Sequence, residues 1–217
     1  MIFHKEGKEF ARRKLLADKV NTWLHTYQHP IQVHIGSDGD PFASHVYRHF
    51  MEQTPVRDNI KYSILTNGLM FKEFHLKVPH VINNLTKLGI SIDGASKETY
   101  EKLRLGGRWD KIIEGLECMA EQKQKHGFRF ILHFVVQKDN YHEMEDIIHL
   151  GKQYGADRVW LNKMEDWNVF DNFDQMNIFS PEHPLHNDYQ DRLEQVKSYL
   201  GFEKNPIVEV PTLNIKR

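Results

Sequence analysis

Short apolar runs alternate along this chain with longer segments of mixed polarity, and this alternation constrains the fold more than any other feature. Helices are expected between the runs, because parallel strands need a crossover connection of about a dozen residues or more. The pattern therefore predicts an α/β fold with a parallel sheet, either open or curled into a barrel. The five runs typical of strands are Ile31–Gly36, Ile60–Leu65, Gly89–Asp93, Phe128–Val136 and Arg158–Asn162.

The segments between the runs have the polarity pattern of helices. Helices are expected at Phe42–Gln53, at Val81–Leu88, from Ser96 onward, at Asp110–Lys125, over the amphipathic Tyr141–Tyr154 and at about Pro184–Tyr199. Two domains follow from this organisation: a core over residues 1–164, and a C-terminal extension over residues 165–217 that packs on the core. An edge strand is expected at Ile207–Val210. Trp167, Phe170 and Phe173 either shape a substrate cap or pack under the core.

Charge and composition exclude several classes of protein. The 217 residues include 29 Lys and Arg against 30 Asp and Glu, and the net charge of −1 argues against a general nucleic-acid binder. No stretch approaches the roughly 18 apolar residues that a membrane span needs. Met1–Lys14 mixes charges of both signs and has no apolar signal-peptide core, so a cytoplasmic protein is expected.

Cys118 is the single cysteine of the chain. One thiol excludes an intramolecular disulfide, a multi-thiolate zinc site, and any iron–sulfur cluster held on three or four cysteines of this chain. Cys118 falls within an expected helix and is interpreted as a small buried apolar residue. The His25/His29 and His45/His49 pairs have the spacing of metal ligands, but 14 histidines produce such spacings by chance, so no metal site is predicted.

Polar and small residues follow each expected strand, where ligands of parallel α/β proteins bind. Gly39 permits close approach of the backbone, and Asp40 with Pro41 would fix a turn before a helix. Asp93 can accept from hydroxyls or from an ammonium group. Arg104 can pair with a ligand carboxylate, or alternatively with Glu98 or Glu101 at the surface. These loops together predict a site for a polar small molecule, although such residues are also common in ordinary turns.

Four motifs in order carry a resemblance to a known family. The most specific is ISIDGASKETYEKLRLGGRWDKIIEGLE at Ile90–Glu117, and the others are GDPF at Gly39–Phe42, LTNG at Leu65–Gly68 and FVVQKDNYHEM at Phe134–Met144. Between about Ile31 and Asn162 the chain resembles the radical SAM superfamily, in particular the core of its SPASM/Twitch group.

The resemblance implies a partial (βα)6 barrel that binds S-adenosylmethionine (AdoMet) across the strand ends. The backbone at 39–41 would meet the methionine amino group, Ser91 and Asp93 the ribose or amino group, and Arg104 the carboxylate. In the family a [4Fe-4S] cluster cleaves AdoMet to a 5′-deoxyadenosyl radical that acts on a substrate, which here is unknown. The residues assigned to cofactor binding in this way are Gly39, Asp40, Pro41, Thr66, Asn67, Ser91, Asp93, Arg104, Gln137 and Asn140.

The chain departs from the family at the cluster. The family's CxxxCxxC loop after the first strand has no counterpart, and Met1–Leu16 resembles the segment that follows that loop. The expectation is a radical SAM core without its first strand, inactive alone, whose strand and cluster loop come from an upstream segment or a partner chain. The alternatives are a cluster-less binding or docking module, and a remnant that folds poorly.

Overall fold

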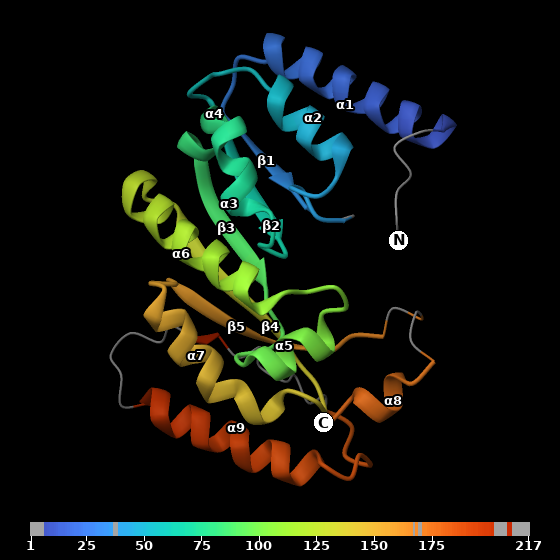
Figure 1. Ribbon diagram of the computed structural model, residues 1–217, viewed down its shortest axis with the longest axis vertical. Coiled ribbons are helices and arrows are strands. Elements are labelled where there is room, and N and C mark those ends of the chain that lie inside the picture. Colours follow the sequence, from blue (N-terminus) through green and yellow to red (C-terminus); the bar gives the residue numbers. More distant parts are fainter. Residues whose placement is uncertain (1–6, 37–38, 167, 169–170, 202–207, 210–217) are drawn as a thin grey trace. The chain divides into compact units, whose positions relative to one another are not determined.

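Figure 1 shows a computed structural model of the chain, which describes residues 7–36, 39–166, 168, 171–201 and 208–209. Helices and strands alternate along it, so the expected α/β class is confirmed. The chain forms two compact units. Unit 1 comprises Met1–Ile90 and Glu114–Arg129, and unit 2 comprises Ser91–Ile113 and Phe130–Arg217.

Unit 1 contains three parallel strands: β1 (Ile31–Ile35), β2 (Ile60–Thr66) and β3 (Leu85–Ser91). β1 pairs with β2 and β2 pairs with β3, with one shift of register between Tyr62 and Ser63. In this register His34 lies opposite Ser63, and Ser63 lies opposite Lys87. The helical segments of this part of the chain are α1 (Lys8–Thr26), α2 (His45–Gln53), α3 (Phe71–Phe74), η1 (His75–Lys77), α4 (Pro79–Asn83) and α6 (Trp109–His126).

The two faces of this sheet differ in polarity. Tyr62, Ile64 and Ile90 are almost completely buried on one face. On the other face His34 and Lys61 are exposed and Lys87 is half-buried. Parallel sheets are usually covered with apolar residues on both faces, so the polar face marks where unit 1 can meet a polar ligand.

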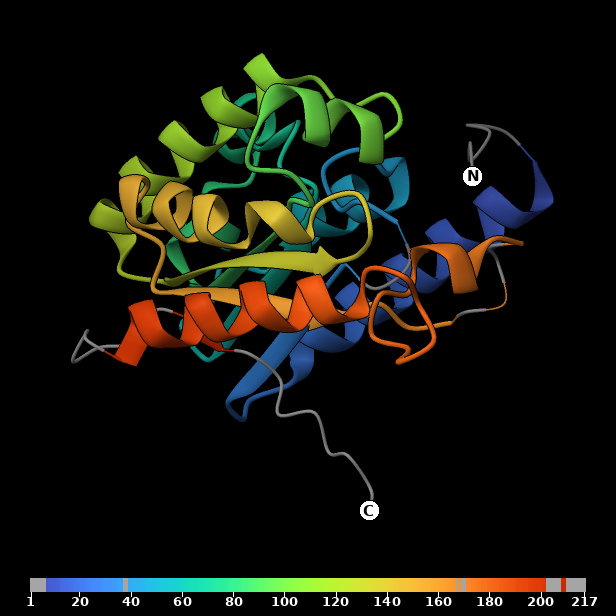
Figure 2. The ribbon, with the colours of Figure 1, turned by 90° about the horizontal axis from the view of Figure 1, so that it is seen from below.

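Unit 2 has the same construction. β4 (Arg129–Val136) pairs with β5 (Arg158–Lys163), and β5 pairs with the two-residue β6 (Val208–Glu209), all parallel. In Figures 1 and 2, α9 runs alongside α7, and the two helices are in contact. The helical segments are α5 (Lys97–Leu103), η2 (Tyr141–Glu143), α7 (Met144–Gln153), α8 (Phe173–Met176) and α9 (His186–Gly201).

The expected helix at Val81–Leu88 is wrong in its second half. α4 ends at Asn83, and β3 begins at Leu85, four residues before the expected strand start at Gly89. The apolar spacing of Val81, Leu85 and Leu88 is that of one face of a helix. Pairing of Leu85 with Tyr62 decides for the strand, which is a tertiary interaction that local periodicity does not reveal.

The helix expected from Phe42 begins at His45 instead. The Asp40 carboxylate accepts hydrogen bonds from the amides of Phe42 and Ala43, which holds this segment as a turn. Ser44 then caps the helix by accepting from the Tyr47 amide.

The edge strand expected at Ile207–Val210 is present as β6, Val208–Glu209. Trp167 and Phe170 lie outside the described residues, so their role stays a prediction, as does the division of the chain at residue 164. Among the described residues, none of the helices combines the length and the apolar character needed to cross a membrane.

Gly36 provides a test of how tightly the end of β1 is built. Its φ is +112°, and a Cβ there would lie 2.1 Å from the Leu65 carbonyl oxygen. We expect Gly36→Ala to lower the free energy of unfolding by at least about 2 kcal/mol, measured by urea denaturation. Gly127→Ala is the control, since its φ is +74° but it meets open space, and should cost about 1 kcal/mol. Equal losses of unfolding free energy in the two variants would contradict the close approach of the Leu65 carbonyl to Gly36.

Candidate functional site

The loop after β1 and the end of β2 form the first group of site residues, within unit 1. Gly39 has a φ of +92°, a conformation that favours glycine. Pro41 lies against Gly36, because a Cβ on Gly36 would be 3.0 Å from the proline ring. Thr66 is the last residue of β2, and Asn67 follows it. The group therefore sits at the carboxyl ends of two paired strands.

Asp40 holds this group together through four hydrogen bonds. Its Oδ2 accepts from the Thr66 hydroxyl at 2.5 Å and from the Asn67 amide at 2.7 Å. Its Oδ1 accepts from the amides of Phe42 and Ala43 at 2.9 and 3.0 Å. Both carboxylate oxygens are thus used within the protein, and the side chain ties the β1 loop to the end of β2.

The Thr66 and Asn67 side chains are also engaged in the loop. The Gly68 amide donates to the Thr66 hydroxyl, and the Leu69 amide donates to the Asn67 side-chain oxygen. The groups of this loop left to meet a ligand are the Asn67 side-chain nitrogen and main-chain groups around Gly39 and Pro41. A groove of about 1040 Å³ adjoins this loop and is lined by Gly39 and Asp40 together with residues of α1, β1 and α2.

Asp93 and Arg104 form the centre of the second group, within unit 2. Arg104 Nη2 lies 2.6 Å from Asp93 Oδ2, and Asp93 Oδ1 accepts from the Val135 amide at 2.9 Å. Burial raises the pKa of Asp93, while the Arg104 charge and the two hydrogen bonds oppose that shift. The alternative pairing of Arg104 with Glu98 or Glu101 is wrong, since its partner is Asp93.

Asn140 connects Asp93 to the end of β4. Its Nδ2 donates to the carbonyls of Asp93 and Val135, and its Oδ1 accepts from the Gln137 amide. Asn140 is completely buried, so these bonds fix the loop firmly. Ser91, the last residue of β3, is half-buried.

Two buried polar atoms of the second group are unsatisfied. Arg104 Nε, a donor, and Gln137 Oε1, an acceptor, have no hydrogen-bond partner among the described residues. Buried polar atoms in proteins nearly always have a partner, so an orphan donor and an orphan acceptor in one cluster call for explanation. A polar ligand with both acceptor and donor atoms would satisfy them.

Glu143 is a site residue that the sequence did not single out. Its carboxylate accepts from the Ala95 amide at 2.7 Å, the Ser96 hydroxyl at 2.6 Å and the Thr99 hydroxyl at 2.7 Å. Burial alone would raise the pKa of Glu143, but these hydrogen bonds outweigh burial and lower it. Glu143 thereby anchors the loop that follows Asp93. No local signal reveals this role, because its partners lie more than 40 positions away.

Cys118 is buried in α6, as expected, with its Sγ 3.8 Å from His75 Nδ1. Burial raises the pKa of its thiol, so a thiolate is disfavoured. His49 Nε2 lies 2.6 Å from Asp18 Oδ1, and the His45 ring contacts the Arg48 guanidinium. Both histidines of this pair therefore have protein partners. Within the described part of the chain, no group of three or more His, Cys, Asp or Glu side chains could hold a metal ion.

The structure thus brings the expected residues together in two groups. Gly39, Asp40, Pro41, Thr66 and Asn67 belong to unit 1, and Ser91, Asp93, Arg104, Gln137 and Asn140 belong to unit 2. Each group lies where strands end and joins loops distant in sequence. This arrangement defines a parallel α/β protein with polar loops at its strand ends, where ligands of such proteins bind.

The chain belongs to the radical SAM superfamily. The family model "Radical SAM superfamily" matches residues 3–151, which is more than half of the chain. The match includes every residue of both site groups.

Curated relatives agree with this family. A probable GTP 3′,8-cyclase of Saccharolobus islandicus is 28% identical over 100 residues, covering 46% of this chain and 30% of the relative. An AdoMet-dependent heme synthase of Methanosarcina barkeri is 28% identical over 99 residues, covering 43% of this chain and 26% of the relative. The matched part spans less than a third of the length of these relatives.

Solved structures share the fold. SuiB of Streptococcus suis bound to S-adenosylmethionine matches 97% of this chain and 44% of its own, with a TM-score of 0.57 and 14% identity. A histidine-tagged form of anSMEcpe with bound AdoMet matches 91% of this chain and 54% of its own, with a TM-score of 0.55 and 16% identity. The chain therefore has the α/β fold of radical SAM proteins.

Ionisation of Glu143 should make stability depend on pH. Because its pKa is lowered from 4.5, its contribution is present above that value and is lost as the pH falls through the lowered pKa. We expect Glu143→Gln to reduce the free energy of unfolding by about 2 kcal/mol at neutral pH and by less in acid, measured by urea titrations. Glu145→Gln, on the surface of α7, is the control. A loss of unfolding free energy that does not change with pH would show that the ionised carboxylate of Glu143 does not hold the loop.

Proposed function

We propose that this chain is the AdoMet-binding part of a radical SAM enzyme. The observation that carries the proposal is a pair of buried atoms without a partner among the described residues: Arg104 Nε, in the motif Ile90–Glu117, and Gln137 Oε1, in the motif Phe134–Met144. AdoMet offers a carboxylate that accepts from a guanidinium, and hydroxyl and amino groups that donate to an amide oxygen. The reaction and substrate of the two named relatives are not carried over, because the match covers less than a third of them.

The roles of the residues follow from their contacts. Asp93 holds the Arg104 guanidinium by one nitrogen, Nη2, which orients it for a carboxylate. In unit 1 the Asp40 side chain is fully used within the protein, so it holds the loop at Gly39 and Pro41 in place and does not itself contact a ligand. Asp40 and Glu143 act as positioning residues that fix the binding loops. When bound, AdoMet supplies the sulfonium whose cleavage the family uses.

A [4Fe-4S] cluster does not fit the residues of this chain. The one thiol, Cys118, is buried beside His75 with a raised pKa, and a cluster needs three or more thiolates. The proposal therefore places the cluster ligands outside these 217 residues. The chain alone would bind AdoMet without cleaving it. We place this binding in the cytoplasm.

The free edge of β1 is a suitable position for the segment that carries those ligands. β1 is an end strand, and among the described residues it pairs only with β2. On α1 beside it, Leu16 and Val20 line the groove and are 49% and 45% exposed. A helix that connects parallel strands covers both of them, so α1 has the position to cover β1 and one further strand. We propose that this strand comes from an upstream segment or a partner chain and bears the cluster loop.

The same free edge favours one alternative function, a docking module without catalysis. Unpaired edges accept strands from other chains, and the apolar side chains of α1 would bury the added strand. In this alternative AdoMet or a related nucleotide is retained only as a ligand. The likeness to the SPASM/Twitch group is compatible with both functions and stays a prediction.

AdoMet binding by the isolated chain tests the proposal. We expect saturable heat on calorimetric titration, and a Kd raised about tenfold by Arg104→Lys, which keeps the charge beside Asp93 but loses the forked donor geometry. Arg108→Gln, four residues further along, should leave the Kd unchanged. The absence of heat at millimolar AdoMet would overturn the proposal for this chain.

An iron assay tests the placement of the cluster. After anaerobic reconstitution with iron and sulfide, the purified chain should hold far less than one cluster, and Cys118→Ala should hold the same residual iron. Stoichiometric cubane iron on the chain alone would contradict the placement of the ligands outside it.

A further inference from the structure

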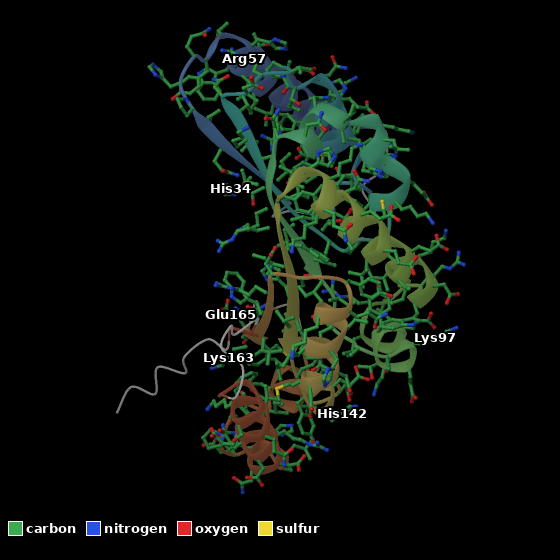
Figure 3. The ribbon with its side chains drawn as sticks, turned by 90° about the vertical axis from the view of Figure 1, so that its left-hand side faces the viewer. His34, Arg57, Lys97, His142, Lys163 and Glu165 are labelled. Carbon is green, nitrogen blue, oxygen red and sulfur yellow. The ribbon has the colours of Figure 1, made fainter. Side chains whose placement is uncertain are left out.

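The polar face of the unit 1 sheet carries a row of three side chains that the proposed function does not use. His34 of β1 lies opposite Ser63 of β2, which lies opposite Lys87 of β3. Neighbouring strands are about 4.8 Å apart, so the row spans about 10 Å across the sheet. Figure 3 shows His34 on the side of the strands away from the helices at the right of the view. An imidazole, a hydroxyl and an ammonium group therefore face the same side.

In the neighbouring row on this face, where Gln32 of β1 lies opposite Lys61 of β2, the side chains have hydrogen-bond partners. There the Gln32 amide donates to the Thr86 hydroxyl at 2.8 Å, and Lys61 Nζ donates to Asn84 Oδ1 at 2.8 Å. In the row of His34, Ser63 and Lys87, no side chain has a hydrogen bond or ion pair with any described residue. The protein thus satisfies one row internally, whereas the next row has no partner among the described residues. In that row His34 is exposed, Lys87 is half-buried and Ser63 is buried.

Lys87 is the unusual member of the row. It lies in the middle of β3 and is only half-buried, whereas a lysine on a sheet usually reaches water freely. The next residue of β3 on this face is Gly89, which has no side chain to cover the ammonium group. The position keeps a cation accessible on a parallel sheet face, where apolar residues are the norm.

We propose that His34, Ser63 and Lys87 bind an oxyanion, a phosphate or carboxylate group, of the molecule on which the protein acts. The three groups can donate to different oxygens of one tetrahedral or planar anion, and charge-assisted hydrogen bonds are the strongest available to it. Arg104, which the AdoMet proposal uses, belongs to the other unit. This second site therefore assigns an acidic substrate class to the chain.

Anion titrations without AdoMet test this site independently of the proposed function. Inorganic phosphate, pyrophosphate and malonate are titrated into the chain at constant ionic strength with chloride as the balancing anion, followed by calorimetry and histidine NMR shifts. We expect saturable binding that moves the His34 signals and weakens at least tenfold in Lys87→Gln, a loss of about 1.4 kcal/mol. The preference between phosphates and malonate identifies the anion class.

Two further variants separate the site from general electrostatics and from misfolding. Lys87→Arg keeps the cation and should bind phosphate within about threefold of wild type. Lys61→Gln removes a charge from the adjacent row and should leave the affinity unchanged. Equal weakening by Lys61→Gln and Lys87→Gln, or no saturable binding of any of the three anions, would overturn the proposal.

An AdoMet arm distinguishes this site from the cofactor site. Lys87→Gln should leave the AdoMet Kd unchanged, and saturating phosphate should not compete with AdoMet. Competition, or loss of AdoMet affinity in Lys87→Gln, would assign the row to the cofactor and reject it as a substrate site. Failure of AdoMet to bind would leave the anion result intact, so the two proposals fail separately.

Discussion

The unequal burial of the two faces of a parallel sheet is the constraint on which the rest of unit 1 depends. Tyr62, Ile64 and Ile90 are buried on one face, and their removal from water supplies the main stabilisation. The other face is then free to carry polar groups such as His34 and Lys87. A sheet covered with apolar residues on both faces would be more ordinary, but it would offer no polar surface to a ligand.

Carboxylates hold the candidate binding loops in place. Asp40 accepts four hydrogen bonds and joins two strand ends, and Glu143 accepts three and fixes the loop after Asp93. Asp40, which looks like a ligand contact in the sequence, therefore has a structural role, because both of its oxygens already accept hydrogen bonds within the protein. In unit 1, main chain around Gly39 is left without a side-chain role in holding the loop. In unit 2, Arg104 Nε and Gln137 Oε1 have no partner among the described residues.

Elements held by contacts between residues close in sequence were predictable, and those that depend on contacts between distant segments were not. The strands β1, β4 and β5 were predictable because their apolar runs are bounded by turn residues. The start of β3 at Leu85 was not, since the same apolar spacing suits a helix until Leu85 pairs with Tyr62. The role of Arg104 in ligand binding stays a prediction, and its alternative partners Glu98 and Glu101 were wrong, because Asp93 is eleven positions away and meets it only after folding.

The sequence by itself determined the α/β class, the radical SAM motifs and the lack of thiols for a cluster, since composition and short-range pattern suffice for these. Only the tertiary structure decided which polar side chains are satisfied. Both carboxylate oxygens of Asp40 are bonded, whereas Arg104 Nε, Gln137 Oε1 and the Lys87 ammonium have no partner in the part of the chain that the structure describes. The physical reason is that hydrogen-bond partners and strand registers are set by contacts between segments far apart in the chain, which local sequence does not encode.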